Sequence, residues 1–243
     1  MEAVIKINDL KKSYGSVLAV DGVNYHVNRG EMFGLVGPDG AGKTTTIRML
    51  VGLLNPYSGS AEVLGYDLLS QKNLIKDEIG YLSQKFSLYG DLTIDENIEF
   101  FADIHGVKHF EKRRDELLEF TRLTPFRDRL ADKLSGGMKK RVGLARTLML
   151  SPKILLYDEP TTGLDPITVK IIHELIKKTH IELNATSLVI SHDIEIFKYA
   201  TSVAMLHEGK IVYSGPAKTI WESDNPYIYQ FIRGLEEGPI KIK

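Results

Sequence analysis

One short segment restricts the fold of this chain more than any other. An apolar run at residues 32–36 leads into Gly37-Pro38-Asp39-Gly40-Ala41-Gly42-Lys43-Thr44, which fits the P-loop pattern G-x-x-x-x-G-K-[ST]. Residues 44–54 then favour a helix. A buried strand, a glycine-rich loop and a helix in this order predict a P-loop NTPase core. The alternative is a glycine-rich turn with a surface lysine, which the strand and the helix on either side disfavour.

The residue types of this loop predict a site for a nucleoside triphosphate. Glycines let backbone N–H groups converge on phosphate oxygens, and the following helix points its positive end at the same anion. Lys43 is expected to reach the β- and γ-phosphates, and the Thr44 hydroxyl to bind Mg²⁺. The predicted phosphate-binding residues are Gly37, Pro38, Asp39, Gly40, Ala41, Gly42, Lys43, Thr44 and Thr45.

Carboxylates and a histidine follow two later apolar strands. Asp158 and Glu159 end the run 154–157, and His192 follows the run 188–190. Asp158 is predicted to complete the Mg²⁺ shell, and Glu159 to polarise an attacking water. Parallel strands bring their carboxyl ends to one edge of a sheet, so His192 should reach the γ-phosphate. The alternatives are that either carboxylate caps a helix or turn, and that the histidine is structural.

Strands and helices alternate along the chain, which predicts an α/β fold with a mostly parallel sheet and helices on both faces. Strands at 4–8 and 17–28, joined by a turn at Tyr14-Gly15, form an N-terminal antiparallel β region. The helix-only stretch 93–130 is interpreted as an inserted helical subdomain. The predicted division is a nucleotide-binding core at 1–92 and 131–224, the subdomain at 93–130 and a C-terminal tail at 225–243.

The tail carries an apolar helix face, formed by Tyr227, Ile228, Phe231 and Ile232. Two partners are open for this face, the core of the same subunit or a second subunit. In contrast, the basic run Lys139-Lys140-Arg141 is expected to be the solvated face of a helix.

Composition excludes several other classes of protein. The 243 residues have a net charge of −1, which gives no electrostatic footprint for nucleic acid. The chain has no cysteine, so neither a disulfide partner nor a cysteine metal site is expected. No signal peptide is expected, and no stretch approaches the roughly 18 apolar residues of a membrane helix.

The ordered motifs resemble the nucleotide-binding subunit of ATP-binding-cassette (ABC) transporters. The motifs that carry the resemblance are Tyr14, the P-loop, Gln84, Leu134-Ser135-Gly136-Gly137, Asp158-Glu159, Gly163-Leu164-Asp165 and His192. The resemblance implies Mg²⁺-dependent ATP hydrolysis coupled to transport. It also implies a head-to-tail homodimer, or pairing with a second ATPase subunit, in which each ATP lies between the P-loop of one subunit and the Ser-Gly-Gly loop of the other.

The resemblance also implies roles for single residues. Tyr14 matches the aromatic residue that stacks on adenine, and Gln84 the glutamine that links Mg²⁺ and water to the helical subdomain. Glu159 matches the catalytic glutamate and His192 the switch histidine. The residues implied to act across the dimer are Ser135, Gly136, Gly137 and Asp165. Two positions depart from the commonest pattern: Met138 follows the two glycines, and Asp39 places an acid inside the P-loop.

Two subfamilies share the resemblance. Residues 83–93 are similar to the ATPases of drug and multidrug exporters, whereas 134–168 and the tail are similar to Mla-like phospholipid transport ATPases. Lipid or a lipophilic compound is therefore the expected cargo. The implied partner is a transmembrane permease, which would hold the subunit at the cytoplasmic face of the cell membrane.

Two other function classes stay open on the sequence. A soluble ABC ATPase acting on ribosomes or DNA usually carries two cassettes or a long coiled-coil insertion, and this sequence has neither. An unrelated P-loop switch or kinase is the other class; a GTPase would need Asn-Lys-x-Asp, which is absent.

Overall fold

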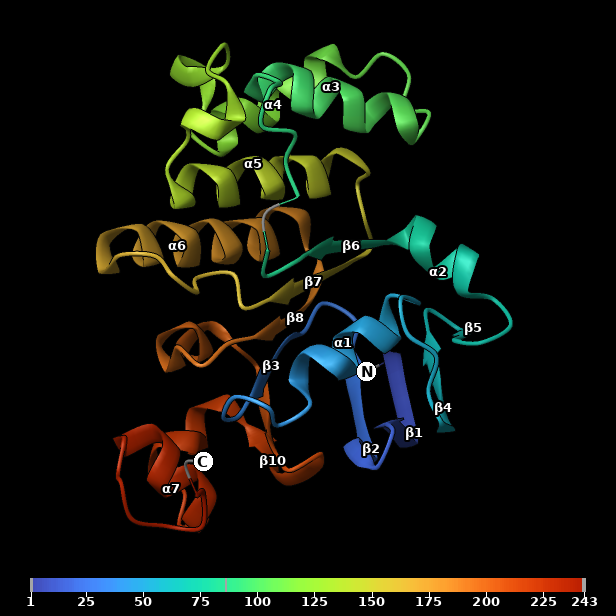
Figure 1. Ribbon diagram of the computed structural model, residues 1–243, viewed down its shortest axis with the longest axis vertical. Coiled ribbons are helices and arrows are strands. Elements are labelled where there is room, and N and C mark those ends of the chain that lie inside the picture. Colours follow the sequence, from blue (N-terminus) through green and yellow to red (C-terminus); the bar gives the residue numbers. More distant parts are fainter. Residues whose placement is uncertain (1, 86, 242–243) are drawn as a thin grey trace.

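The computed structural model describes residues 2–85 and 87–241 and contains two β-sheets with helices packed around them (Figure 1). Phe86, which belongs to the exporter-like segment 83–93, lies outside the described residues, as do residues 1, 242 and 243. Within the described part, no helix is both long enough and apolar enough to span a lipid bilayer.

The larger sheet has six strands and contains the strand of the P-loop. Its order is β10 (Lys210–Pro216), β9 (Ser202–His207), β3 (Met32–Val36), β8 (Thr186–Ile190), β7 (Ile154–Asp158) and β6 (Ile79–Leu82). The strands from β9 to β6 run parallel, and β10 turns back antiparallel through Glu208-Gly209. The predicted mostly parallel sheet is confirmed.

The smaller sheet is antiparallel, as predicted for the N-terminal region. Its order is β2 (Val17–Asn28), β1 (Ala3–Tyr14), β4 (Ser58–Val63) and β5 (Tyr66–Asp67). β1 continues well beyond the predicted end at residue 8, because the polar residues after it still pair with β2 and β4. The turn between β1 and β2 contains Gly15 at a φ of 59°, a left-handed conformation that suits glycine.

The helices include those predicted after the P-loop, within 93–130 and in the tail, with two differences from the prediction. They are α1 (Lys43–Leu50), α2 (Lys72–Glu78), α3 (Ile94–Ile104), α4 (Glu111–Phe120), α5 (Gly136–Met149), α6 (Pro166–Leu183) and α7 (Pro226–Arg233). α1 ends at Leu50, four residues before the predicted end. α2 was not predicted, because it is short and buries only Ile75.

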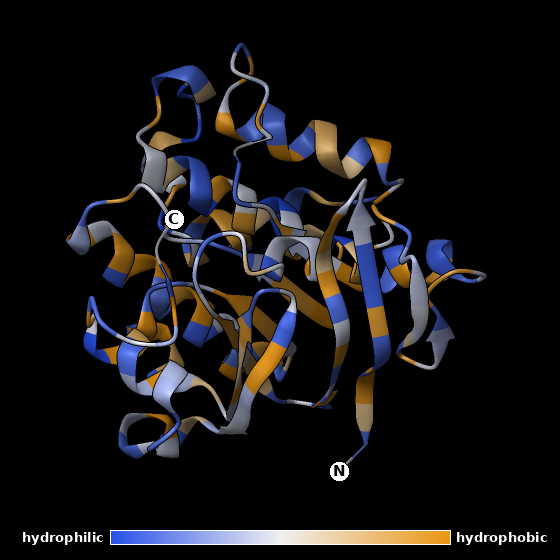
Figure 2. Cartoon of the chain, turned by 60° about the horizontal axis from the view of Figure 1, so that its bottom comes forward, coloured by the Kyte–Doolittle hydropathy of each residue, from blue (hydrophilic) through white to orange (hydrophobic). Residues whose placement is uncertain are grey.

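Two hydrophobic clusters cover the two faces of the larger sheet. Leu155 and Tyr157 of β7 point into the cluster formed with α3, α4, α5 and α6, whereas Ile154 and Leu156 point into the other. That second cluster contains α1, α2 and the antiparallel sheet, so this face is covered by a sheet as well as by helices (Figure 1). In Figure 2 the helices carry alternating blue and orange bands, as expected where one face meets the core and the other meets water.

The helical region lies beyond α5, on the side away from the sheet (Figure 1). α3 begins with a capping box, in which Thr93 accepts from the Glu96 N–H and the Glu96 carboxylate accepts from the Thr93 N–H. α3 and α4 both pack on α5, which also contacts β6 and α6. α5 therefore connects the inserted helices to the nucleotide-binding core.

The prediction that Lys139-Lys140-Arg141 forms a solvated face is wrong at Lys140. Lys140 lies on the side of α5 that faces the Gln84 segment and is only 2% exposed. Its ammonium group donates to the backbone oxygens of Ser83 and Gln84. The positive charge of Lys140 led to the prediction that it is exposed. Its burial is possible because the ammonium group donates to carbonyl oxygens that need a donor.

The apolar face of the tail packs on the core of its own subunit. Ile228 is 1% exposed and belongs to the cluster that includes β9 and α6, and Phe231 packs against the same cluster. The Gln230 side chain bonds both the N–H and the carbonyl of Ile240, which ties the end of the chain to α7. Of the two partners left open for this face, the structure shows packing within the subunit.

Ile228→Ala is expected to destabilise the fold by about 2–5 kcal/mol, because the truncated side chain leaves a cavity in a closed core. Thermal unfolding of the purified chain measures this loss. Tyr229→Ala is the matched control, since Tyr229 is the next residue on α7 and is 43% exposed. If both variants melt together, α7 is not part of the cooperative core.

Candidate nucleotide-binding site

Three of the predicted site motifs, the P-loop, Asp158-Glu159 and His192, meet at one edge of the larger sheet. The P-loop follows β3, Asp158 ends β7, and Ser191-His192 follows β8, which lies between β3 and β7. All three strands are parallel, so their carboxyl ends share this edge, as the sequence predicted.

A cavity of about 190 Å³ lies over the P-loop. It is lined by Ala19, Asp39, Gly40, Ala41, Gly42, Lys43, Thr44, Thr45, Gln84 and Glu159. Two of the loop glycines lie hard against other backbone: a Cβ on Gly37 would overlap the Leu206 carbonyl, and one on Gly42 the Ala19 carbonyl. Both the close approach between backbones and the positive φ, 148° at Gly37 and 102° at Gly42, therefore require glycine at these two positions.

Lys43 is held at the base of this cavity. Its Nζ donates to the carbonyl oxygens of Gly37 at 2.6 Å and Pro38 at 2.9 Å, and it lies 3.8 Å from Oε1 of Glu159. Burial lowers the pKa of Lys43, against the opposing effect of Glu159, Asp39 and Asp158. The exposed Asp39 thus adds negative charge near the lysine without covering the loop.

Thr44 and Asp158 provide the oxygen ligands that suit Mg²⁺. The Thr44 hydroxyl donates to Oδ1 of the fully buried Asp158 at 2.9 Å, across 114 residues of sequence. The Tyr81 hydroxyl donates to Oδ2 of Asp158, also at 2.9 Å. A hydroxyl and a carboxylate side by side fit a hard divalent cation whose remaining ligands come from phosphates and water. Burial and the neighbouring Asp158 raise the pKa of Tyr81 to about 12.

Glu159 adopts a strained backbone conformation at this edge. Its φ is 48°, in the left-handed region that non-glycine residues rarely occupy and that clusters at functional sites. Its Oε2 lies 2.8 Å from Nδ1 of His192 and accepts from the Thr162 hydroxyl at 3.2 Å. An ionised carboxylate can only accept, so Nδ1 carries the proton in this contact.

Gln84 reaches the cavity from the loop after β6. Its side chain lines the space above Lys43 and Thr44, while its backbone oxygen accepts from Lys140 at 2.6 Å. Burial lowers the pKa of Lys140 to about 8, against the opposing effect of Asp158 and Glu159.

Several predicted site residues do not line this cavity. Ser135, Gly136, Gly137 and Asp165 belong to the starts of α5 and α6 instead: Ser135 accepts from the Met138 N–H, and Asp165 from the N–H groups of Ile167 and Thr168. The two starts lie side by side, because a Cβ on Gly137 would overlap the Thr168 methyl. Tyr14 is also outside the cavity and is 49% exposed at the end of β1.

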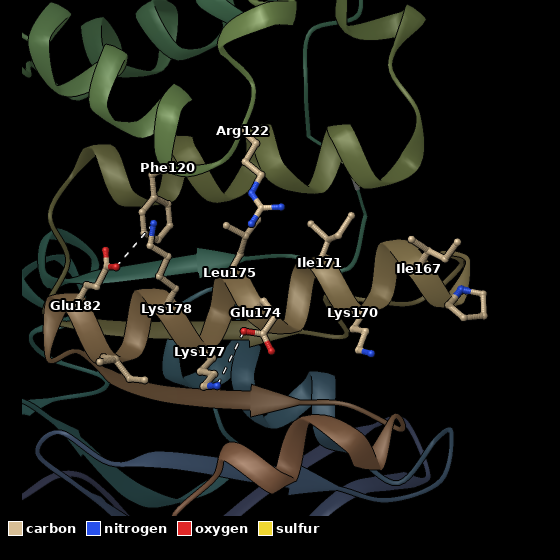
Figure 3. Close-up of a pocket in the computed structure, with 12 residues that line it drawn as sticks. Phe120, Arg122, Ile167, Lys170, Ile171, Glu174, Leu175, Lys177, Lys178 and Glu182 are labelled. Carbon is tan, nitrogen blue, oxygen red and sulfur yellow. Dashed lines mark ion pairs between the residues drawn. The ribbon is translucent and has the colours of Figure 1, made fainter.

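A larger cavity lies elsewhere in the described chain. A groove of about 820 Å³ runs along α6 between Phe120, Arg122 and Ile171 (Figure 3). Two of its three lysines, Lys177 and Lys178, pair with glutamates of the same helix. No P-loop residue lines it, so size does not identify the nucleotide site.

Three residues of the site were missed on the sequence: Tyr81, Thr162 and Lys140. Tyr81 lies on the strand beside β7, and Thr162 follows Glu159 in the same turn, so position relative to the carboxylates could have indicated both. Lys140 contacts a loop 56 residues earlier in the chain, and no local pattern predicts that contact.

Comparison with known proteins gives one consistent result. A family model described as ABC transporter matches residues 20–162. The chain is 42% identical over 230 residues to the probable multidrug ABC transporter ATP-binding protein YbhF of Escherichia coli, covering 91% of this chain and 39% of YbhF. It is 40% identical over 229 residues to the bacitracin transport ATP-binding protein BcrA of Bacillus licheniformis, covering 94% of this chain and 74% of BcrA.

Solved structures show the same fold. The cbiO1 protein of Clostridium perfringens, part of the ABC transporter complex cbiONQ, matches with a TM-score of 0.82 and 28% identity over 96% of both chains. The ATP-binding cassette MJ0796, dimeric and bound to ADP and Pi in a post-hydrolysis state, matches with a TM-score of 0.79 and 28% identity over 88% of this chain and 98% of that one.

Proposed function

Because this chain belongs to the ABC transporter family of ATP-binding proteins, a family of Mg²⁺-dependent ATPases, we propose that it is the ATP-hydrolysing motor of a transporter. One observation carries the proposal: the P-loop, Gln84 and Glu159 line a single cavity, while the Ser135 loop and Asp165 lie outside it. Because only some of the family's nucleotide-site motifs line this cavity, we expect a second copy of the chain to supply the others.

The residues around the cavity have separate tasks. Lys43 and the N–H groups at the start of α1 bind the phosphates, and Tyr14 offers its exposed ring to the adenine. Thr44, Asp158 and Gln84 would hold Mg²⁺, which would neutralise phosphate charge.

Glu159 is the group proposed to orient and activate water. The carboxylate accepts a proton or a hydrogen bond from the attacking water, and Lys43 Nζ lies 3.8 Å from its Oε1. His192 donates from Nδ1 to Oε2, so its ring orientation follows the carboxylate. The histidine is half exposed, which leaves its other ring nitrogen free to meet the γ-phosphate.

The Ser135 loop is proposed to complete the site of the partner subunit. Ser135 is exposed and caps α5, so the N–H groups of Gly136 and Gly137 begin a helix whose positive end points outward. Asp165 stands beside it at the start of α6 and is proposed to cross the dimer interface.

A mixing experiment tests the composite site. A Ser135→Asp subunit combined with a Lys43→Ala subunit should form heterodimers with one intact site, since both lesions fall in the other site. Aspartate keeps the helix cap but repels phosphate, so Ser135→Asp alone is expected to lose activity while it remains folded. ATP turnover of the mixture should exceed the average of the two parents.

Ser135→Asn is the matched control, because it caps α5 without adding charge. It should retain most of the activity. A mixture that shows only the parental average, in heterodimers verified to bind ATP at one site, would contradict a composite site. Gly137 is a poorer choice for this test, because any side chain there meets Thr168 of its own subunit.

The proposed partner is a transmembrane permease that holds this subunit at the inner face of the cell membrane. The names of YbhF and BcrA, and the similarity of residues 83–93 to exporter ATPases, support a lipophilic or drug-like cargo. The tail gives lipid cargo no support, since it packs on its own core. None of the relatives named above is described as a lipid transporter.

Affinity purification from membranes tests this partner. A multispan protein that co-purifies supports the motor, whereas ribosomal proteins would support the soluble ATPase instead. In the assembled transporter, a lipophilic drug should stimulate ATP turnover more than a phospholipid or methionine does. Equal turnover with and without all three would contradict the proposed cargo class.

A further inference from the structure

Two buried cations of α5 hold the loop that carries Gln84. Lys140 donates from Nζ to the carbonyl oxygens of Ser83 at 3.2 Å and Gln84 at 2.6 Å. Farther along the same helix, Arg146 donates to the carbonyl oxygen of Ser87 at 2.7 Å. We call residues 83–85 and 87 the Gln84 loop. Its two ends are thus fastened to one helix by charge-assisted hydrogen bonds.

Both cations are almost fully buried. Lys140 is 2% exposed and Arg146 9%, and the Arg146 guanidinium stacks over the Phe101 ring of α3 at 4.7 Å. Burying a cation is unfavourable unless its donors are satisfied, so these side chains need the loop carbonyls where they are. In turn, the carbonyls of Ser83, Gln84 and Ser87 accept hydrogen bonds from α5.

The same loop faces the nucleotide site, and the same helix begins at the Ser135 loop. The Gln84 side chain lines the P-loop cavity while its own backbone oxygen is held by Lys140. Lys140 lies in the second turn of α5, and Ser135 caps the first. If α5 shifts, the Gln84 loop therefore has to move with it, or the buried charge-assisted hydrogen bonds of Lys140 and Arg146 have to break.

We propose that Lys140 and Arg146 are positioning residues, which fasten the Gln84 loop to α5 so that Gln84 enters the nucleotide site only in the position that α5 sets. The proposal rests on the proposed function in so far as Gln84 acts on Mg²⁺ and water there. Neither cation touches the reacting atoms, because both act through the loop backbone. A change in the position of the Ser135 loop is then coupled through α5 to the position of Gln84.

Lys140→Met tests this link, since methionine retains an apolar stem of similar length but lacks the donors. Turnover is expected to fall about tenfold or more, as for other groups that orient a ligand through a neighbour. The dissociation constant for ATP, measured by calorimetry, should stay within about twofold, because the P-loop is intact. Thermal unfolding checks that the variant is folded, and a modest fall in melting temperature is expected because the carbonyls of Ser83 and Gln84 lose their donor.

Three further variants interpret the result. Lys140→Gln restores neutral N–H donors and should recover part of the turnover. Lys112→Met removes an exposed lysine of α4 and should change nothing. Gln84→Ala separates the role of Gln84 in the site from the positioning role of Lys140. If turnover is impaired in Gln84→Ala but normal in Lys140→Met, the positioning role is overturned. If Gln84→Ala is itself normal, the role of Gln84 in the proposed function fails, and the functional half of the link with it.

A spectroscopic measurement without nucleotide tests whether Lys140 and Arg146 fasten the Gln84 loop. The chain has no cysteine, so Lys85→Cys gives a unique spin-label position on the exposed part of the Gln84 loop. Label mobility should rise when Lys140→Met or Arg146→Met is added and stay low with Lys112→Met. Unchanged mobility in both α5 variants would show that these cations do not fasten the loop.

Discussion

Glu159→Gln is expected to lower ATP turnover by about 10²–10⁴-fold, the usual contribution of a positioned general base. Glutamine has nearly the same shape and can still accept from Nδ1 of His192 and from the Thr162 hydroxyl. The variant should therefore keep its fold and its ATP affinity while it loses the carboxylate that activates water.

Steady-state turnover and calorimetric ATP binding measure the two effects separately. With ATP the variant should also accumulate as a dimer on size-exclusion chromatography, because the closed state no longer resolves by hydrolysis. Glu182→Gln on the outer part of α6 is the control and should be fully active. Turnover of Glu159→Gln close to that control would remove Glu159 from the proposed role.

Lys43→Ala should lose about 10- to 100-fold or more in ATP affinity, since a hydrogen bond from a cation to phosphate contributes about 1.5–3 kcal/mol. Lys43 is only 5% exposed and its pKa is lowered by burial, so the site holds a poorly solvated cation that phosphate oxygens would stabilise.

Calorimetry with ATP and Mg²⁺ checks this loss, and thermal unfolding checks that the variant folds. Lys218→Ala, which removes an exposed lysine far along the chain, should bind ATP normally. ATP affinity of Lys43→Ala equal to that control would contradict the assignment of the P-loop as the phosphate site.

The parts of this protein that the sequence determined are those with a local cause. The apolar run at 32–36, the glycine-rich loop and the start of the helix after it are where they were predicted, since strand runs and P-loops are encoded within a few neighbouring residues. The shared sheet edge of Asp158 and His192 also followed, because parallel strands have one carboxyl edge. α2 was not predicted because only one of its residues, Ile75, is buried, and a single buried residue gives no helical periodicity in the sequence.

Tertiary structure alone decided which groups meet across long sequence separations. The Thr44–Asp158 bond joins positions 114 residues apart, and the distance between them follows from packing, not from either motif. Charge made Lys139-Lys140-Arg141 look solvated, yet Lys140 is buried because unpaired carbonyls of the Gln84 loop lie within its reach. The tail face had two possible partners until the fold placed Ile228 in its own core. Burial depends on what else is nearby, and only the folded chain supplies the neighbours.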